Sequence, residues 1–248
     1  MAEDDRGHAG LLAGPALPLR SWLWLPAGAA LFAAAVLFGA VASSYGPFTP
    51  ELGVDAAWGR DRNPVLAAAA LAVHYFLGPV GGVILAAAAC AALLLRRRPL
   101  HAAAFGSITA AGWASSEAGK VLVGRLRPPS RAVHALVSET RPDSFPSGHT
   151  ALAFALALAV VLVLAHTARQ RWAAGAAGVL FTAAVGLSRV YLGVHYPTDV
   201  IGSVLVGTAA MLVWLPVWNR AAGPRLAQAL ERRQGRPQPG PAGEGGRR

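Results

Sequence analysis

Long stretches without acidic or basic residues separate the polar parts of this sequence, and they limit the folds the chain can adopt. The longest covers residues 63–95, which hold no Asp, Glu, Lys or Arg. A transmembrane helix needs about 20 consecutive, mostly apolar residues to cross a hydrocarbon core of about 30 Å. Only 14% of the chain is charged, whereas an ordinary soluble domain averages roughly 25%. The sequence therefore predicts a membrane-embedded bundle of helices.

The longest stretch contains its own break. A continuous helix over residues 63–95 would be roughly 50 Å long, which is too long for one crossing. The Gly-Pro pair at residues 78–79 and the Gly pair at residues 81–82 favour an interruption of the helix. We therefore expect residues 64–77 to form a helix near the membrane interface, followed by a membrane-spanning helix.

The apolar segments together predict an all-α fold. We expect an integral-membrane bundle of six transmembrane helices, with the interfacial helix between the first and second spans. The predicted spans are residues 21–44, 78–95, 101–119, 150–165, 172–187 and 200–218.

The two ends of the sequence have a different composition. Residues 1–20 are polar and charged, and we expect a short disordered tail there. Residues 221–248 are rich in Gly, Pro and Arg and predict a disordered basic tail. Residues 21–220 then form one membrane domain. Cys90 is the only cysteine, so an intramolecular disulfide is impossible.

The arginines predict the orientation. The formal net charge is +10, but the arginines form short clusters between apolar runs, which favours membrane topology over nucleic-acid binding. Residues 96–98 and the pair Arg169 and Arg171 fall on the same side as both tails, and this side receives two thirds of all arginines. The positive-inside rule places that side in the cytoplasm of a multi-pass cell-membrane protein.

Three polar stretches fall at the opposite face of the predicted bundle. They are KVLVGRLRP at residues 120–128, SFPSGHT at residues 144–150 and SRVYLGVHYPTD at residues 188–199. Each adjoins the end of a predicted span, so all three are expected to meet at one membrane surface.

The first kind of chemistry in these stretches is anion binding. Lys120, Arg127 and Arg189 supply three cations, and the two arginines can bind a phosphate in bidentate fashion. Ser147 precedes a predicted helix, whose unpaired backbone N–H groups attract anions.

The second kind of chemistry is proton transfer and nucleophilic attack. His195 and Asp199 are four residues apart and would share a face on a helical turn. Such an aspartate can hold the proton of one ring nitrogen and leave the other as a nucleophile or base. His149 is a second imidazole that can act as a general acid. The set indicates phosphoryl transfer without a metal: there is no H-E-x-x-H, no paired cysteine and no carboxylate cluster, and we expect no metal and no other cofactor.

The spacing of these residues resembles a known family. K-x6-R-P, P-S-G-H and S-R-x5-H-x3-D occur here in that order, as in the type-2 phosphatidic-acid phosphatase superfamily. That superfamily includes lipid phosphate phosphatases, bacterial prenyl-diphosphate phosphatases and the soluble vanadium haloperoxidases. The resemblance covers about residues 21–218, and its motifs extend from Lys120 to Asp199.

The resemblance implies a role for each matched residue. His195 would attack phosphorus and form a phosphohistidine, Asp199 would orient its ring, and His149 would protonate the leaving oxygen of the lipid. The residues implied in phosphate binding are Lys120, Arg127, Ser147, Gly148 and Arg189.

Other polar residues receive ordinary structural interpretations. Arg125 and Arg131 are expected to face solvent or lipid headgroups. Glu117 is expected to pair with Lys120 or an arginine, because an unpaired charge near the end of a span is costly. Asp143 would repel a phosphate unless it pairs with Arg141 or Arg131. Five histidines receive no catalytic role, three of them as hydrogen-bonded interfacial residues (His74, His101 and His166) and two in the tail and outer loop (His8 and His134).

The sequence thus predicts a membrane phosphatase that acts on a lipid phosphate or diphosphate at the extracytoplasmic face. Prenyl diphosphates are the first expected substrates, followed by phosphatidate and phosphatidylglycerophosphate. Its partners would be the lipid substrate and the bilayer, with no nucleic acid. A lipid phosphotransferase that uses the same site, and a non-catalytic protein that binds or transports lipid phosphates, remain alternatives.

Overall fold

The computed structural model describes residues 14–233, and this part of the chain is helical without β-strands. Nine α-helices are joined by short connections and one long loop, and two of them continue into π-helical turns. The elements are α2 (Trp24–Ser44), α3 (Leu52–Arg60), α4 (Pro64–Phe76), α5 (Pro79–Leu95), α6 (Pro99–Val123), α7 (Gly148–Ala159), η1 (Val160–Leu164), α8 (Ala168–Tyr191), α9 (Pro197–Val217), η2 (Trp218–Ala222) and α10 (Gly223–Arg233).

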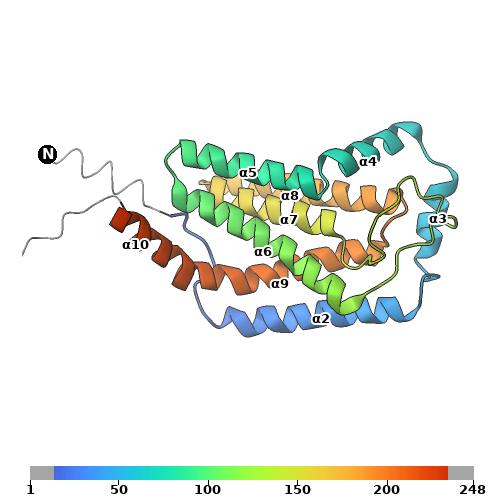
Figure 1. The fold of residues 1–248 in the computed structure, drawn as a ribbon, viewed down its shortest axis with the longest axis horizontal. Coiled ribbons are helices and arrows are strands. Elements are labelled where there is room, and N and C mark those ends of the chain that lie inside the picture. The colour runs from blue at the N-terminus through green and yellow to red at the C-terminus, as the bar shows by residue number, and fades with distance from the viewer. Residues whose placement is uncertain (1–13, 234–248) are drawn as a thin grey trace, which may run out of the picture.

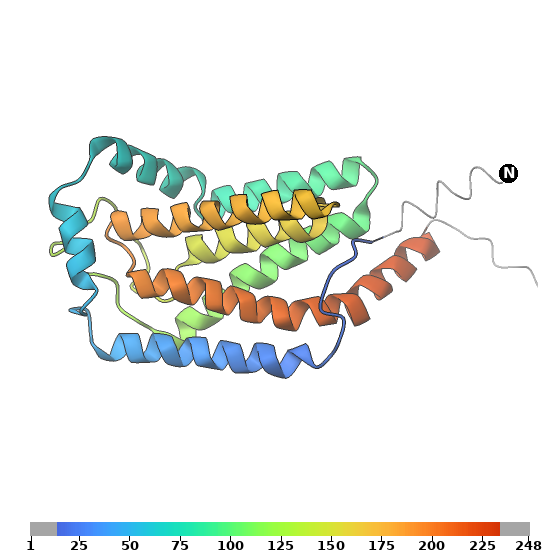
Figure 2. The same ribbon diagram turned by 180° about the vertical axis from the view of Figure 1, so that it is seen from behind.

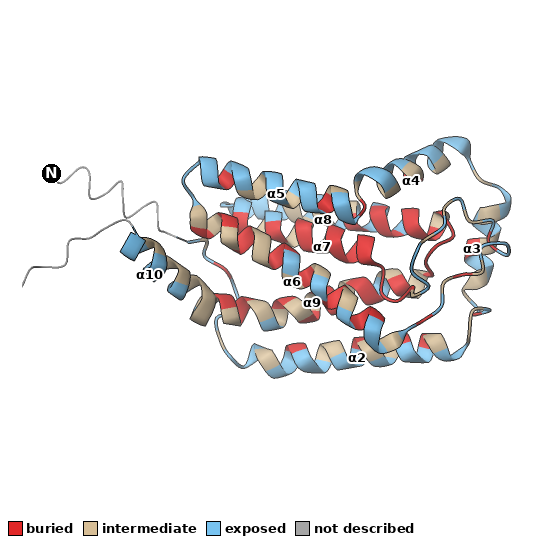
Figure 3. Ribbon diagram, viewed as in Figure 1, coloured by how far each residue is buried: buried red, intermediate tan, exposed pale blue. Residues whose placement is uncertain are grey.

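The long helices lie side by side and form a bundle (Figures 1 and 2). Helix α7 lies between α6 and α8, and α9 packs against α2, α6 and α7. Buried residues are concentrated on α7 and at one end of the bundle, whereas α4 and α5 expose most of their surface (Figure 3). Exposed leucines and valines on the outer helices match the surface expected for contact with lipid.

Glycines allow close packing at the end of the bundle that holds the motifs. Phe145 is completely buried, and its ring lies between Gly39 of α2 and Gly202 of α9. A Cβ atom at either glycine would overlap the ring, so the close approach of these helices requires residues without a side chain. Phe145 therefore anchors the start of the P-S-G-H turn between two helices.

The predicted break within residues 63–95 is confirmed. Helix α4 ends at Phe76, α5 begins at Pro79, and the two axes differ by 61°. The side chain of Asn63 caps α4 by accepting a hydrogen bond from the N–H of Val65 at 2.9 Å.

The predicted all-α fold is confirmed for residues 14–233, whereas the predicted number of six membrane crossings is not. By length and hydropathy, three described helices can cross a membrane: α2, α8 and the continuous helix Pro197–Arg233. The bent pair α4–α5 raises the number to four. Helix α6 has the length of a span but carries several polar side chains, and the apolar helix Gly148–Leu164 is shorter.

Three segments differ from the predicted tails and loops. Residues 223–233, predicted to be disordered, form α10, because Leu226 packs on the hydrophobic core. Leu17, in the predicted N-terminal tail, is buried, and its carbonyl accepts a hydrogen bond from Asn219 at 3.4 Å. Helix α3 forms between the predicted first span and the predicted interfacial helix, where the sequence analysis expected no helix. The remaining predicted tail residues, 1–13 and 234–248, lie outside the described part.

The two ends of the bundle have different chemistry. Residues 96–98 and the α8 start, with Arg169 and Arg171, lie at the end from which both chain termini leave (left in Figure 1). The three motif stretches lie at the opposite end, next to α3. The basic clusters therefore lie at the same end of the bundle as the first and last described residues, and the side of the membrane that they face stays a prediction.

Candidate active site

Four helix ends position the three motif stretches. Helix α6 ends at Val123. Gly124 caps it with a left-handed backbone, φ +60°, and the chain then turns into a long loop. That loop leads to the α7 start at Gly148, and a short turn joins α8 to α9. A single bridge between Leu126 and Asp143 holds the two ends of the loop together. The motifs therefore meet although they are distant in sequence.

His195 lies between a carboxylate and a guanidinium. Its Nδ1 is 3.3 Å from Oδ2 of Asp199, which also accepts the N–H of Tyr196 at 2.9 Å. Its Nε2 is 3.0 Å from Nη1 of Arg127. The predicted pairing of His195 and Asp199 is therefore present. Asp199 is placed to accept a hydrogen bond from Nδ1 of His195, and Nε2 points toward the cations.

The surroundings of His195 keep its ring neutral. Burial lowers the pKa of His195 well below 6.5, and the nearby charges of Arg127, Arg189 and Lys120 lower it further. A neutral ring with its proton on Nδ1 has a lone pair on Nε2. The geometry and the electrostatics therefore agree on Nε2 as the reactive atom.

The three predicted phosphate-binding cations lie near this ring, with Arg189 and Lys120 buried and Arg127 half-buried. Arg189 is completely buried and pairs with the carboxylate of Glu139. Arg127 donates to the carbonyls of Arg141 and Val194, each at 2.8 Å, which orients its guanidinium. Lys120 is 6% exposed and lies beside the α7 start.

The α7 start supplies neutral donors. The Ser147 hydroxyl oxygen caps the helix and accepts from the Thr150 hydroxyl at 3.0 Å, so its own hydrogen can be donated to an anion. The Ser147 N–H donates to the carbonyl of Asp199 at 3.2 Å, which ties the second motif to the third. Gly148 is the first helical residue, next to Lys120: a Cβ atom there would lie 3.8 Å from Cε of the lysine.

His74 is part of the site, and the sequence analysis missed it. Its ring stacks on His149 with the centroids 5.7 Å apart, and its Nδ1 is 2.9 Å from Nη1 of Arg189. His149 is buried, and its Nε2 has no hydrogen-bond partner among residues 14–233. The bend between α4 and α5 brings His74 here, and no pattern in the sequence indicates that bend's direction.

Glu139 is a second residue that the sequence analysis missed. It pairs with Arg189 and lines a polar cavity of about 340 Å³ together with Arg127 and Arg141. A lone glutamate in a loop carries no recognisable signal in the sequence. The carboxylate of Glu139 is thus paired with Arg189, a residue that the motifs assign to phosphate binding.

The prediction for Arg125 was wrong. Arg125 is 1% exposed, not at the surface, and it donates to Asp199 at 2.8 Å and to Glu51 at 2.6 Å. Burial of a guanidinium is possible here because the two carboxylates compensate its charge. Arg131 is exposed, as predicted.

The predicted pairing of the other carboxylates is confirmed. Arg141 donates to Asp143 at 2.7 and 3.1 Å and to Glu117 at 2.6 Å. One guanidinium thus pairs with both carboxylates, so the three side chains together keep one negative charge.

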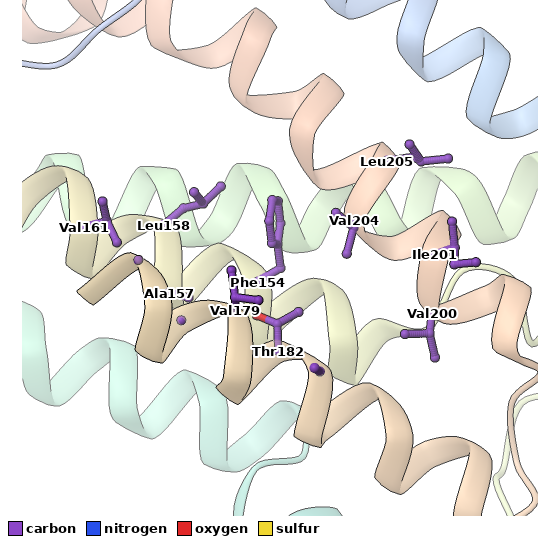
Figure 4. Close-up of a pocket in the computed structure, with 13 residues that line it drawn as sticks. Phe154, Ala157, Leu158, Val161, Val179, Thr182, Val200, Ile201, Val204 and Leu205 are labelled. Carbon is purple, nitrogen blue, oxygen red and sulfur yellow. The ribbon is translucent and has the colours of Figure 1, made fainter. Parts of the chain in front are cut away.

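An apolar cavity lies apart from this polar site (Figure 4). It has a volume of about 540 Å³ and lies between α7, α8 and α9. Val200, one residue after Asp199, lines it, whereas none of the charged site residues does. Among residues 14–233, no group of three or more His, Cys, Asp or Glu side chains is arranged to hold a metal ion.

The motif region matches a known family. A family model described as the PAP2 superfamily matches residues 100–222, a segment that contains all three motifs.

Curated relatives match over part of their length. Undecaprenyl-diphosphatase BcrC of Bacillus subtilis (strain 168) is 36% identical over 77 residues, which are 31% of this chain and 36% of that protein. The undecaprenyl-diphosphatase of Sulfolobus acidocaldarius is 32% identical over 119 residues, 46% of this chain and 54% of that protein. The lipid A 1-phosphatase of Porphyromonas gingivalis is 37% identical over 90 residues, 36% of this chain and 18% of that protein.

A solved structure shares the fold. It is a transmembrane PAP2 type phosphatidylglycerolphosphate phosphatase from Bacillus subtilis, with a TM-score of 0.59 and 21% identity. The similarity covers 85% of this chain and 98% of that protein.

Proposed function

This chain belongs to the PAP2 superfamily through residues 100–222, and we propose that it is a membrane phosphatase that hydrolyses a lipid phosphate or diphosphate. The observation that carries the proposal is the ring of His195, held between Asp199 at Nδ1 and Arg127 at Nε2. A neutral imidazole oriented in this way beside three cations is equipped to attack a phosphate.

The first step is binding of the substrate phosphate. Arg127, Arg189 and Lys120 neutralise its charge, and the Ser147 hydroxyl and the N–H of Gly148 donate to its oxygens. Glu139 must leave Arg189 as the phosphate enters, because a carboxylate and a phosphate cannot share one guanidinium without repulsion.

The second step transfers the phosphoryl group to the enzyme. The lone pair of His195 Nε2 forms a bond to phosphorus while the bond from phosphorus to the lipid oxygen breaks. The electron pair of that bond stays on the leaving oxygen, which takes a proton from His149. The ring of His149 donates as an imidazolium, a form that the negative charge of the bound phosphate favours. Asp199 stabilises the positive charge that develops on the ring.

The third step releases phosphate. A water oxygen attacks phosphorus, and the bond between phosphorus and His195 Nε2 breaks with its electron pair returning to nitrogen. His149 takes the proton that the water loses, so the enzyme returns to its starting state. Every charge in these steps is balanced by side chains of this chain, so we propose that turnover requires no metal.

Prenyl diphosphates are the substrates we place first. Two of the relatives described above are named undecaprenyl-diphosphatases. Phosphatidate and phosphatidylglycerophosphate come next, since the proposed site residues recognise the phosphate group that all these lipids share.

We also propose the topology in the membrane. Six crossings, with α6 and α7 included, would leave both termini on one side and the site on the other. The positive-inside rule makes the terminal side cytoplasmic and places the site at the extracytoplasmic face.

The experiment is phosphate release by the purified protein in detergent with EDTA. The panel contains a prenyl diphosphate, phosphatidate and phosphatidylglycerophosphate, and the His195→Ala variant is measured beside the wild type. We expect release that persists in EDTA and is lost in the variant. Full turnover by His195→Ala would refute the phosphohistidine route, and labelled phosphate on a second lipid would identify a transferase instead. Binding of lipid phosphate without any turnover would favour the non-catalytic alternative.

A further inference from the structure

Arg125 lies outside the matched motif residues, yet Arg125 and Arg189 are the two largest fully buried side chains of residues 14–233. Its Nη1 donates to Oδ1 of Asp199 at 2.8 Å and to the Thr198 hydroxyl at 2.6 Å. Its Nη2 donates to Oε1 of Glu51 at 2.6 Å. One guanidinium thus joins the loop before α3, the loop after α6 and the start of α9.

We infer that Arg125, together with Glu51, is a positioning residue that fixes the carboxylate of Asp199 and, through it, the ring of His195. This inference rests on the proposed function, because it concerns how the nucleophile of that reaction is oriented.

The division of labour between the two oxygens of Asp199 supports the inference. Arg125 engages Oδ1, which leaves Oδ2 to the His195 ring at 3.3 Å and to the Tyr196 N–H at 2.9 Å. A carboxylate held at both oxygens cannot rotate, so the ring it contacts has one preferred orientation. A rigid His–Asp pair requires a partner at Oδ1, the carboxylate oxygen that does not contact the histidine, and Arg125 is that partner.

Glu51 contacts both Arg125 and Thr198, the residue before Asp199. Its Oε2 accepts the N–H of Thr198 at 3.0 Å, and its Oε1 accepts the Thr198 hydroxyl at 2.7 Å. Thr198 lies in the first turn of α9, where a carboxylate interacts favourably with unpaired N–H groups. Glu51 therefore fixes the residue that directly precedes Asp199.

Tyr196 completes the arrangement. The Arg125 guanidinium lies over its ring at 3.9 Å from the centroid, and the Tyr196 hydroxyl donates to the carbonyl of Pro47 at 2.7 Å. The residues on both sides of Pro197 are thus tied to the segment that follows α2. We call Arg125, Glu51, Thr198, Tyr196 and Asp199 the framework. Only Asp199 of the framework is hydrogen-bonded to the ring of His195.

The energetic cost of burying these charges indicates that the framework fixes the position of Asp199 more than it stabilises the fold. Bringing a guanidinium and two carboxylates out of water costs free energy that their attraction only roughly offsets, so apolar residues would often be at least as stable there. Arg125 and Asp199 are nevertheless about 1% exposed or less. The gain is a fixed geometry at the residue that orients His195.

Kinetics of four variants test the inference. Arg125→Gln and Glu51→Gln remove the two charges one at a time, and Arg125→Lys keeps the cation without its planar fork. Arg131→Gln is the matched control, since Arg131 is an exposed arginine of the same loop. We expect Arg125→Gln to lower kcat about 10–100-fold, as for other residues that orient a catalytic group, with KM changed less than about 3-fold. Arg125→Lys should recover part of the loss, and the control should match the wild type.

A double variant and a spectroscopic measurement guard against a trivial folding defect. If the two residues act on one carboxylate, Arg125→Gln and Glu51→Gln together should cost less than the product of the single effects. Independently of turnover, the ¹⁵N shifts of the His195 ring should report a proton on Nδ1 in the wild type and a mixture of tautomers in Arg125→Gln.

The outcomes separate this inference from the proposed function. Wild-type kcat in Arg125→Gln, or a loss that appears only in KM, would overturn the inference while the function stands. Unchanged ring shifts in the variant would also overturn it, even if the wild type proved inactive on every lipid. Inactive wild type with the expected change in ring shifts would refute the function alone.

Discussion

At the scale of single residues, the ring of His195 works between charges of opposite sign. Asp199 at Nδ1 and Arg127 at Nε2 give its two nitrogens different roles. Burial and the neighbouring cations lower the pKa of the ring, which keeps the proposed nucleophile unprotonated at neutral pH. Each partner of the ring can therefore be removed with a defined consequence.

Asp199→Asn should lower kcat roughly 10³-fold without loss of fold. The amide has nearly the shape of the carboxylate, but it can donate to Nδ1 and so favour the tautomer that carries the proton on Nε2. Steady-state turnover of a prenyl diphosphate measures the effect. Retention of more than about a third of wild-type kcat would contradict the role given to Asp199.

Glu139→Gln should strengthen binding of inorganic phosphate about 3–10-fold. The carboxylate of Glu139 pairs with Arg189, so an entering anion must displace this carboxylate. The amide of the Gln variant binds a guanidinium less strongly and is displaced more easily. The inhibition constant of phosphate measures this. Glu231→Gln, an exposed site in α10, loses the same charge at the other end of the bundle and serves as the control. Equal inhibition constants in wild type and Glu139→Gln would disprove the competition.

At the scale of elements, α3 carries a carboxyl group without a partner. Asp55 is 1% exposed, and neither of its oxygens has a hydrogen-bond partner among residues 14–233. Burial raises the pKa of Asp55 to about 8, and the nearby charges of Glu51 and Asp199 contribute while Arg125 opposes them. The protonated form is therefore the one that the fold accommodates at neutral pH.

Asp55→Asn should consequently stabilise the protein more at pH 8 than at pH 4. Between an ordinary value of 3.8 and about 8, unfolding of the wild type releases the proton of Asp55. The free energy of unfolding then falls by about 1.4 kcal/mol per pH unit as pH rises through this window, with no slope from Asp55 outside it. The asparagine cannot ionise and lacks this slope.

Thermal unfolding in detergent at pH 4.5, 6 and 7.5 measures the difference. Asp61→Asn, at an exposed residue just after α3, is the control and should behave as the wild type. A stability difference between Asp55→Asn and wild type that stays constant over this range would contradict the protonated state.

At the scale of the whole molecule, the bundle separates its charges by function. Basic clusters lie at one end of the bundle, whereas at the other end Arg125 and Arg189 are buried and paired with carboxylates. The first arrangement suits anionic headgroups and the second a single bound phosphate. This polarity along the long axis leads to a prediction about orientation in the cell.

Single cysteines in a Cys90→Ala background should reveal that orientation. Ser130 is exposed at the site end and Arg97 at the opposite end. An impermeant thiol reagent on intact cells should label Ser130→Cys and leave Arg97→Cys unlabelled. Both should react after the membrane is opened, which controls for access. Labelling of Arg97→Cys alone on intact cells would reverse the proposed topology.

The sequence by itself determined the helical class, the break before Pro79 and the grouping of the eight motif residues at one end. These depend on local properties: the length of apolar runs, the backbone restrictions of Gly and Pro, and fixed spacings along a helix. It also anticipated the ion pairs of Asp143 and Glu117, since an unpaired charge in such a place is costly.

Only the tertiary structure decided between residues that look alike in the sequence. Arg125 and Arg131 belong to one loop, yet one is buried against Asp199 and the other faces solvent. In the sequence, His74 looks like an interfacial histidine. In the structure, the bend between α4 and α5 brings its ring onto that of His149. The physical reason is that burial and charge pairing depend on which distant segments meet, and a one-dimensional pattern does not contain that information.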